Sequence, residues 1–382
     1  MNIAFFTDTY FPQVNGVVTS VESFRVGLES MGHNVYVFAP KVKGYRDPLE
    51  LKGKVFRFTS FQMKFMPSGN SFPNRLSLPF SLKAYLKLPD LKLDLVHSHT
   101  EFGLGQLANF VAATFRIPHL HTYHTIYPEY VHYLAGGKMI SPRAAEKLSA
   151  FYCNACSGIV VPSDRIKNLL WKYGVKKPIE VIGTGIDLKK YEMGNRDAFR
   201  AKYVLQGSFV CLYVGRLGKE KKVDVAMRCF AKAKIPNKKL LLVGGGPYKP
   251  ELEQLAKELN ILDKVVFAGI VRNDEIADAY AAGDVFTFAS QSETQGLVVL
   301  EAEAAGLPVA AWNDATMVEY VKNDENGYMA NSEAEFSQAI EKIAADKKLR
   351  GRFSAASKKI SADFSFLEQS QKLLKVYENI IS

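Results

Sequence analysis

The sequence predicts an α/β protein built from two domains, each with a parallel sheet covered by helices on both faces. Apolar runs of strand length alternate along the chain with longer segments of helical periodicity, which is the pattern of βαβ units. The 382 residues are too many for one ordinary hydrophobic core and suit two domains of similar size. A hydrophobic content of 47% is typical of a globular protein and not of a disordered one.

The first half of the chain contains the elements of one such domain. Each expected strand is a short apolar run, and each expected helix carries apolar residues three and four positions apart. Ser163 precedes one helix as an N-cap, since serine is strongly preferred there. The expected strands are 2–7, 34–39, 55–58, 93–97, 119–123 and 158–161, and the expected helices are 17–31, 103–115, 141–156 and one that follows residue 163.

The second half repeats this alternation. The expected strands there are 209–214, 239–243, 264–267, 284–288 and 308–311, with helices between them. The chain is expected to pass from one domain to the other near residues 181–187. The sequence therefore predicts an N-terminal domain of residues 1–183 and a C-terminal domain of residues 184–365.

Two glutamates follow the expected strand 284–288. Glu293 lies in the loop at the carboxyl end of the strand, and Glu301 lies about one turn into a helix that begins at Leu297. Open α/β sheets bind ligands at the carboxyl ends of their strands, and the start of a helix suits an anionic ligand. Carboxylates there can accept hydrogen bonds from sugar hydroxyls. The spacing alone is equally compatible with two solvated glutamates at a helix end.

A glycine turn with two cations follows the expected strand 209–214. Gly215 and Arg216 end the strand, and Lys221 follows five residues after Arg216. Arginine can bind two phosphate oxygens at once, and lysine adds a point charge. The stretch lacks the Gly-Lys-Ser/Thr of a P-loop. By themselves these cations would suit a solvated helical turn. Combined with the downstream glutamates, they predict a nucleotide-sugar site whose cations stabilise a departing diphosphate.

Three consecutive glycines, Gly244 to Gly246, follow the expected strand 239–243 and raise the alternative of a dinucleotide site. The third glycine of that fingerprint would fall at position 249, which is Lys249, and Pro247 disfavours it further. A nicotinamide-dependent dehydrogenase is therefore disfavoured, and a tight turn near the donor site is the better interpretation.

The C-terminal motifs resemble those of a retaining family 4 glycosyltransferase of the GT-B fold, in which two Rossmann-like domains face each other across a cleft. The resemblance covers nearly the whole chain, and the stretch from His121 to Tyr133 resembles the 1,2-diacylglycerol 3-glucosyltransferases. It also implies that the last helix, 366–382, packs back onto the N-terminal domain. The motifs that carry the resemblance are Gly215–Lys221, Gly244–Pro247, Glu293–Glu301, Phe6–Val21, Gly32–Val35 and Thr100–Gly103.

The resemblance assigns roles to residues of the C-terminal domain. Glu301 is expected to hold the ribose hydroxyls of the donor and Glu293 the hydroxyls of the transferred sugar, with help from the amides of Gly296 and Leu297. Arg272 is expected over the base. Since the leaving phosphate of this family is thought to take the acceptor's proton, retention of configuration needs no protein nucleophile.

The N-terminal domain contributes a second set of expected site residues. His124 resembles the family's histidine that contacts the donor sugar and orients the acceptor, so it joins Arg216, Lys221 and Glu293 as an expected catalytic residue. Gly16 opens a helix and is expected to offer backbone N–H groups to the distal phosphate. The roles of His121 and His132 stay open. No metal-ligand spacing stands out among the histidines, and neither a metal nor another cofactor is expected.

The positive charge of the protein is concentrated in its first half. Residues 1–185 contain 21 of the 49 basic and 12 of the 39 acidic residues, so this half carries +9 of the net charge of +10. Such an excess suits an anionic surface, and no nucleic-acid-binding module is recognised. Bulky apolar residues alternate with cations between positions 63 and 93, which is typical of an interfacial membrane segment, although a solvated loop and helix over the core would look similar. The expected membrane-binding residues are Lys64, Arg75, Lys83, Lys87 and Lys92.

The sequence thus predicts an enzyme that moves a hexose, expected to be glucose from UDP-glucose, in α linkage to diacylglycerol. A glycosylated lipid or a soluble sugar as acceptor is the first alternative, and a non-catalytic nucleotide-sugar-binding or membrane-scaffolding protein is the second. No apolar run approaches the roughly 18 residues of a membrane span, and no leader peptide is apparent. We therefore expect a cytoplasmic enzyme that is peripheral on the inner face of the cell membrane.

Overall fold

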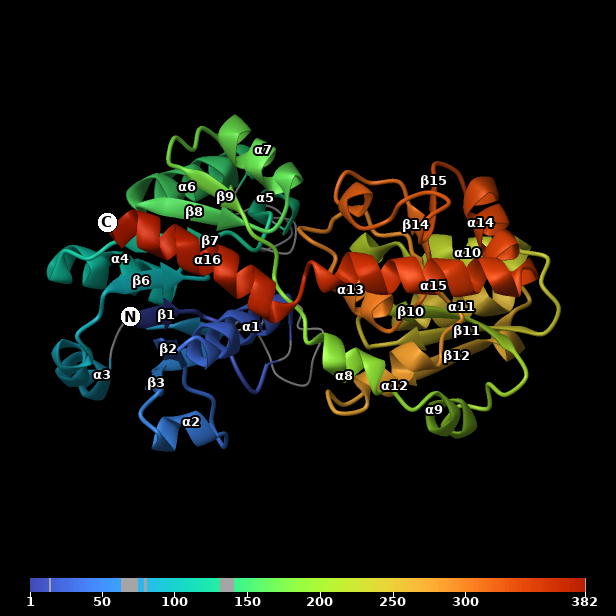
Figure 1. Ribbon diagram of the computed structural model, residues 1–382, viewed down its shortest axis with the longest axis horizontal. Coiled ribbons are helices and arrows are strands. Elements are labelled where there is room, and N and C mark those ends of the chain that lie inside the picture. The colour runs from blue at the N-terminus through green and yellow to red at the C-terminus, as the bar shows by residue number, and fades with distance from the viewer. Residues whose placement is uncertain (14, 63–74, 79–80, 131–140, 382) are drawn as a thin grey trace. The chain divides into compact units, whose positions relative to one another are not determined.

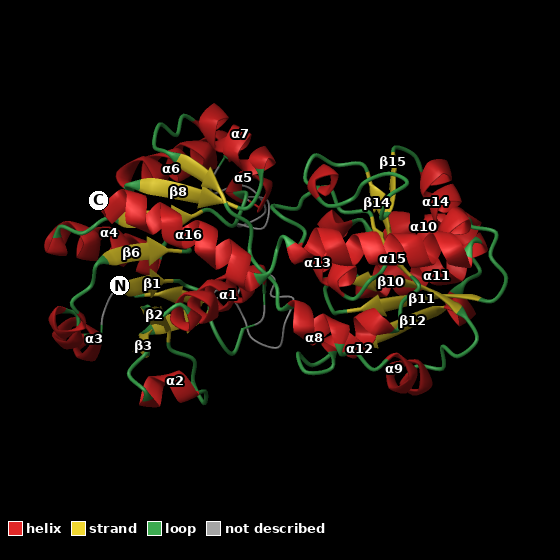
Figure 2. Cartoon of the chain, viewed as in Figure 1, coloured by secondary structure: helices red, strands yellow, loops and turns green. Residues whose placement is uncertain are grey.

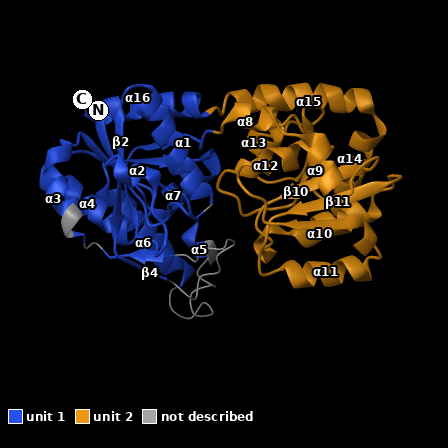
Figure 3. Cartoon of the chain, turned by 90° about the horizontal axis from the view of Figure 1, so that it is seen from below, with its two compact units in different colours: residues 1–185, 366–382 blue, residues 186–365 orange. Residues whose placement is uncertain are grey.

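The computed structural model describes residues 1–13, 15–62, 75–78, 81–130 and 141–381. The chain forms two compact units: unit 1 comprises residues 1–185 and 366–382, and unit 2 comprises residues 186–365 (Figure 3). Each unit contains a parallel sheet with helices packed on it (Figures 1 and 2). The prediction of an α/β protein with two parallel-sheet halves is confirmed.

Unit 1 contains a seven-stranded parallel sheet in the order β3-β2-β1-β6-β7-β8-β9. Its strands are β1 (Asn2–Phe6), β2 (Asn34–Pro40), β3 (Val55–Phe58), β6 (Leu95–Ser98), β7 (His119–Thr122), β8 (Gly158–Val161) and β9 (Ile179–Val181). Its helices are α1 (Gly16–Ser30), α2 (Pro48–Leu51), α3 (Leu82–Lys87), α4 (Gly103–Phe115), α5 (Tyr127–Tyr130), α6 (Pro142–Ala155), α7 (Asp164–Tyr173) and α16 (Phe366–Ile381).

Two short strands of unit 1 were not predicted from the sequence. The strands β4 (Ser60–Gln62) and β5 (Arg75–Ser77) pair antiparallel outside the main sheet. Each is only three residues long, so neither presents enough alternation to be recognised from its own sequence. The strand β9 was missed for the same reason.

The last helix, α16, packs along α1 within unit 1 (Figure 1). The two helices approach closely at Gly27, where a Cβ atom would lie 2.0 Å from Oγ of Ser370. Leu373 and Tyr377 of α16 are fully buried in the core beside α1 and the sheet. The end of the chain is therefore part of the first unit, although 180 residues of unit 2 separate it from the rest.

Unit 2 contains a six-stranded parallel sheet in the order β12-β11-β10-β13-β14-β15. Its strands are β10 (Phe209–Val214), β11 (Lys238–Val243), β12 (Val265–Gly269), β13 (Val285–Phe288), β14 (Val309–Trp312) and β15 (Gly327–Ala330). Its helices are α8 (Leu188–Glu192), α9 (Arg196–Lys202), α10 (Val223–Lys232), α11 (Lys249–Glu258), α12 (Ile276–Ala281), α13 (Leu297–Ala304), α14 (Glu333–Ala345) and α15 (Lys347–Ala362).

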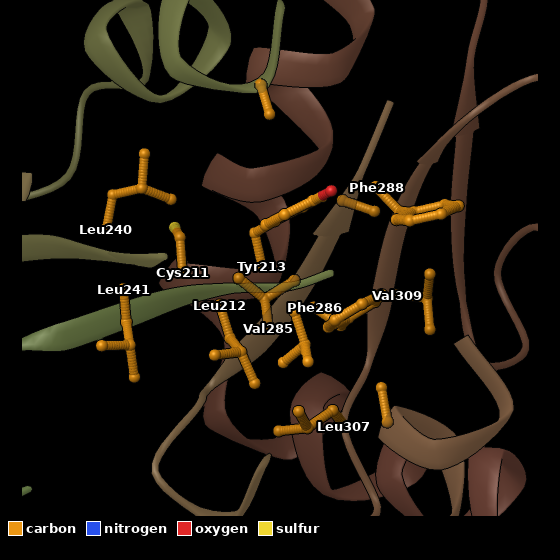
Figure 4. Close-up of a cluster of buried hydrophobic side chains, with 14 of the residues drawn as sticks. Cys211, Leu212, Tyr213, Leu240, Leu241, Val285, Phe286, Phe288, Leu307 and Val309 are labelled. Atoms are coloured by element: carbon orange, nitrogen blue, oxygen red, sulfur yellow. The ribbon is translucent and has the colours of Figure 1, made fainter. Parts of the chain in front are cut away.

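The central strands of unit 2 are buried on both faces, as expected for a parallel sheet between two helical layers. Successive residues of β10, such as Cys211 and Leu212, project to opposite faces and pack against side chains of β11 and β13 (Figure 4). This explains why the strand reads as an uninterrupted apolar run and not as an alternating one.

Both sheets have a point where the strand order reverses. In unit 1 the chain begins at β1, adds β2 and β3 on one side, and then returns to add β6 on the other; β10, β11, β12 and β13 repeat the pattern in unit 2. The loops that leave β1 and β6, and those that leave β10 and β13, therefore diverge at the carboxyl edge of the sheet. Ligands bind at such points in open α/β sheets.

Candidate functional site

The loop after β10 holds the first expected donor residue at the switch point of unit 2. Gly215 has a φ of 152°, a conformation that side chains rarely adopt. Tyr213, buried in the strand, donates a hydrogen bond of 3.0 Å from its hydroxyl to the carbonyl of Arg216. The guanidinium of Arg216 forms an ion pair with Glu220 one turn later, and its side chain is 23% exposed. The loop thus places a partly buried cation at the edge of the sheet.

An ion pair joins the loops after β10 and β13. Nζ of Lys221 lies 2.7 Å from Oε1 of Glu293, and the two side chains are only 17% and 15% exposed. The hydroxyl of buried Thr316 donates to the carbonyl of Glu293 at 3.1 Å, which holds the loop that carries the acid. The structure therefore brings together two residues that lie 72 positions apart in the chain.

The buried carboxylate of Glu301 is hydrogen-bonded by tyrosine hydroxyls. The hydroxyl of Tyr280 donates to Oε2 of Glu301 at 2.5 Å, and Tyr191 hydrogen-bonds the same carboxylate. Burial raises the pKa of Glu301, while these hydrogen bonds and the charge of Lys190 act in the opposite direction. Tyr191, Lys190 and Tyr280 were missed by sequence reasoning, because only the packing of α8 against α12 and α13 brings them to the glutamate.

The helix that carries Glu301 begins without a side-chain cap. Gly296 precedes α13 in the left-handed conformation, with a φ of 83°, and makes no side-chain capping bond to the first turn. The left-handed conformation favours glycine here, and a Cβ atom would lie 2.7 Å from Cε of Met317, the end of a flexible side chain that would have to shift. The amides of Gly296 and Leu297 consequently lie at an uncapped helix start, which suits an anionic group.

The glycine run after β11 forms a tight turn against the backbone of the loop after β10. Gly244 has a φ of 130°, and a Cβ atom there would lie 1.9 Å from the carbonyl oxygen of Gly215. A Cβ atom at Gly246 would lie 2.3 Å from the carbonyl oxygen of Leu217. These glycines are required by close packing beside the arginine loop.

Arg272 is exposed and is paired within its own loop. Its guanidinium makes two hydrogen bonds to the carboxylate of Asp274, of 2.7 and 3.0 Å, and the two side chains are 76% and 64% exposed. In this conformation the arginine is turned toward its own loop and solvent.

Gly16 opens α1 as expected, but the first-turn amides of this helix are already engaged. The side chain of Asn15 accepts hydrogen bonds from the amides of Val17 and Val18, at 3.1 and 3.0 Å. Gly16 itself is exposed. The asparagine is an N-cap that sequence reasoning did not name, although this residue type before a helix is a recognisable signal.

His124 lies just after β7, at the carboxyl edge of the unit 1 sheet. Its Nε2 is 3.1 Å from Nδ1 of His99, which follows the neighbouring strand β6. His124 is half-buried, and burial together with the nearby His121 lowers the pKa of His124 to about 3. The imidazole is therefore neutral at physiological pH and acts as a hydrogen-bonding group and not as a cation.

His121, whose role the sequence left open, is buried beside an acid. Its Nε2 lies 3.3 Å from Oε1 of Glu101, and its Nδ1 lies 2.9 Å from the hydroxyl of Ser98. Tyr127 donates to the other oxygen of Glu101. These contacts place His121 in a network of buried hydrogen bonds with Ser98, Glu101 and Tyr127. His132 lies outside the described residues.

The expected membrane-binding residues have different surroundings. Arg75 is bound to β4, since its guanidinium donates to the hydroxyl and carbonyl of Ser60 at 2.7 and 2.9 Å. Lys87 is exposed and paired with Asp90 at 3.2 Å, and Lys92 is exposed. Lys64 and the side chain of Lys83 lie outside the described part of the structure.

The described residues contain no cluster of three histidine, cysteine, aspartate or glutamate side chains arranged to hold a metal ion. Within the same part of the chain, none of the helices has both the length and the apolar character needed to cross a bilayer.

Comparisons with known proteins match both units. Residues 14–190 match the family model described as Glycosyltransferase Family 4, and residues 195–360 match that described as Glycosyl transferases group 1. An alpha-monoglucosyldiacylglycerol synthase of Streptococcus pneumoniae is 36% identical over 352 residues, which cover 89% of this chain and 77% of that protein. A protein of the same name from Acholeplasma laidlawii is 32% identical over 369 residues, with coverage of 93% and 91%.

The fold is also found in solved structures. The crystal structure of Anabaena HepE in complex with UDP-glucose has a TM-score of 0.79 against this chain at 20% identity, with 99% of each chain covered. Sequence and architecture together identify this chain as a member of glycosyltransferase family 4, with the GT-B fold.

Proposed function

We propose that this glycosyltransferase moves glucose from UDP-glucose to the free hydroxyl of diacylglycerol, with retention of configuration, to give an α-linked membrane glycolipid. The acceptor assignment is supported by the names of the two synthases that are 36% and 32% identical to the chain. The donor assignment is supported by the UDP-glucose complex of HepE, which shares the fold. The observation that carries the proposal is the ion pair between Lys221 and Glu293 at the switch point of unit 2.

The cations would act on the leaving group. Breaking the bond between the sugar and the diphosphate leaves negative charge on the bridging oxygen. Arg216 and Lys221 are partly withdrawn from water, so their fields are stronger there than at the surface. Since these side chains supply the positive charge, we propose that the reaction needs no resident metal or cofactor.

The carboxylates would hold the donor. Glu293 would accept hydrogen bonds from the transferred sugar, and its ion pair with Lys221 couples sugar binding to the cation that contacts the diphosphate. Glu301 would accept hydrogen bonds from the ribose, with Tyr280 fixing its orientation. The amides of Gly296 and Leu297, at the uncapped start of α13, would add donors to the sugar or phosphate.

Unit 1 would supply the acceptor side. His124, neutral and half-buried, would contact the donor sugar and orient the acceptor hydroxyl. The amide of Gly16, an exposed residue, would be the donor to a distal phosphate oxygen, because Asn15 already occupies the next two amides. The acceptor is a lipid, so this half must also reach a bilayer. We propose that it does so at the inner face of the cell membrane through exposed cations, including Lys87 and Lys92, and anionic lipids.

Turnover of labelled UDP-glucose tests the proposal. The full chain is incubated with vesicles that contain diacylglycerol and anionic lipid, and the lipid product is isolated and its anomeric configuration determined by NMR. An α-glucosyl diacylglycerol is expected. If label is found only in a soluble sugar, or only after an already glycosylated lipid is supplied, that compound is the acceptor and diacylglycerol is not. If wild-type chain and Glu293→Gln both leave every acceptor unlabelled while still binding donor, a non-catalytic binding protein is the correct description.

A further inference from the structure

Three histidine rings form a stacked column behind the candidate acceptor site of unit 1. The rings of His97 and His99 lie 4.4 Å apart with an interplanar angle of 27°, and those of His99 and His124 lie 5.4 Å apart at 18°. The outer ring, His124, is the one at the edge of the sheet. The middle ring, His99, is only 2% exposed.

The column is fixed at its inner end. His97 is bonded through Nδ1 to the hydroxyl of Tyr377 and through Nε2 to that of Thr122, both at 2.6 Å. The edge of Phe5 packs against His99 with ring centroids 4.9 Å apart. Strands hold both neighbours of His99, namely His97 and Phe5, and α16 also holds His97. The ring of His99 is therefore fixed in a position where its Nδ1 lies within hydrogen-bond distance of His124.

The two nitrogens of His99 have different surroundings. Nδ1 lies 3.1 Å from Nε2 of His124, whereas Nε2 is buried and has no hydrogen-bond partner within the described ranges of the chain. Burial lowers the pKa of both residues, so each ring is neutral and carries one N–H. A buried N–H without an acceptor is rare in folded proteins. The proton of His99 therefore belongs on Nδ1, where it is donated to His124.

This placement determines the tautomer of the outer ring. If Nε2 of His124 accepts the hydrogen bond from His99, its single proton must be on Nδ1. We propose that His99 is a positioning residue that holds His124 in the Nδ1–H form, so that His124 presents a hydrogen-bond donor, and not a bare nitrogen, to an oxygen of the substrate. The inference rests on the proposed function only for the identity of that oxygen, a sugar hydroxyl or a phosphate.

NMR of the full chain labelled with ¹⁵N at histidine tests the tautomer directly. Correlation spectra at pH 7 are expected to show both His99 and His124 protonated at Nδ1 and unprotonated at Nε2, with assignments made from the signals lost in His124→Gln. A spectrum in which His124 carries its proton on Nε2 would overturn the proposal. Because this measurement needs no turnover, it stays decisive even if the protein proves inactive toward every donor and acceptor.

Two variants then test the consequence for catalysis. His99→Asn keeps a donor near the position of Nδ1 and is expected to retain kcat within about threefold, whereas His99→Leu removes it and is expected to lower kcat about tenfold and to populate the other tautomer of His124. His119→Gln is the matched control, since His119 is also buried but bonds Ser98 and Asn109. An unchanged kcat and an unchanged His124 spectrum in His99→Leu, or an equal loss of kcat in the control, would refute the positioning role.

Discussion

Replacing Lys221 with methionine separates the contribution of this residue to catalysis from its contribution to stability. The side chains of Lys221 and Glu293 are 17% and 15% exposed and lie 2.7 Å apart. Breaking a fully buried pair costs about 3–5 kcal/mol and an exposed one about 0–1 kcal/mol, so a loss of about 2 kcal/mol in the free energy of unfolding is expected. Removing a preorganised cation from the leaving group should lower kcat by about 10²–10³-fold.

The double variant Lys221→Met/Glu293→Gln distinguishes these two effects. It no longer contains an uncompensated charge, so most of the lost stability should return, while kcat should stay low. Lys232→Met is the matched control, because Lys232 pairs with Glu333 at the same distance of 2.7 Å but is 59% exposed. We expect this control to change stability by no more than about 1 kcal/mol and to leave turnover unchanged.

Urea unfolding and steady-state kinetics with vesicle-embedded diacylglycerol supply the measurements. A kcat of Lys221→Met within threefold of the wild type would exclude a role of Lys221 at the leaving group. Recovery of turnover along with stability in the double variant would exclude it equally, since the lysine would then serve only to neutralise Glu293.

Other residues give further tests. Glu301→Gln should raise the KM for the donor about tenfold and change kcat less, since ribose contacts form before the chemical step; an unchanged KM would exclude the ribose contact. Burial raises the pKa of Glu303 well above its ordinary value, so the folded state retains a proton that the unfolded state releases above about pH 4.3. Stability should therefore fall as pH rises, by up to about 1.4 kcal/mol per pH unit, and Glu303→Gln should remove that slope in urea unfolding. Replacing Lys87 and Lys92 with alanine should weaken binding to anionic vesicles up to about thirtyfold at low salt. If cosedimentation with the vesicles is unchanged, other residues make the membrane contact.

Local patterns in the sequence determined the class of fold. Buried parallel strands appear as short apolar runs and their covering helices as periodic segments, so strands such as β10 and β13 were predicted within one or two residues. The short strands β4, β5, β9 and β15 were not, because a segment of three or four residues is specified largely by its partners and not by its own residues. The loops with Arg216 and Glu293 were assigned to the edge of the sheet for the same local reason: each directly follows a recognisable strand.

Which side chains meet depends on how the strands and helices pack. The ion pair of Lys221 with Glu293 joins positions 72 apart, and the bond of His97 to Tyr377 joins positions 280 apart. Neither contact can be recognised from neighbouring residues in the sequence, because both depend on the order of the strands and the packing of the helices. Local sequence patterns thus specified two α/β units and the residue types at their ligand-binding edges. The hydrogen-bond partners, the burial that keeps His124 neutral, and the outward turn of Arg272 depend on long-range packing, which no local pattern encodes.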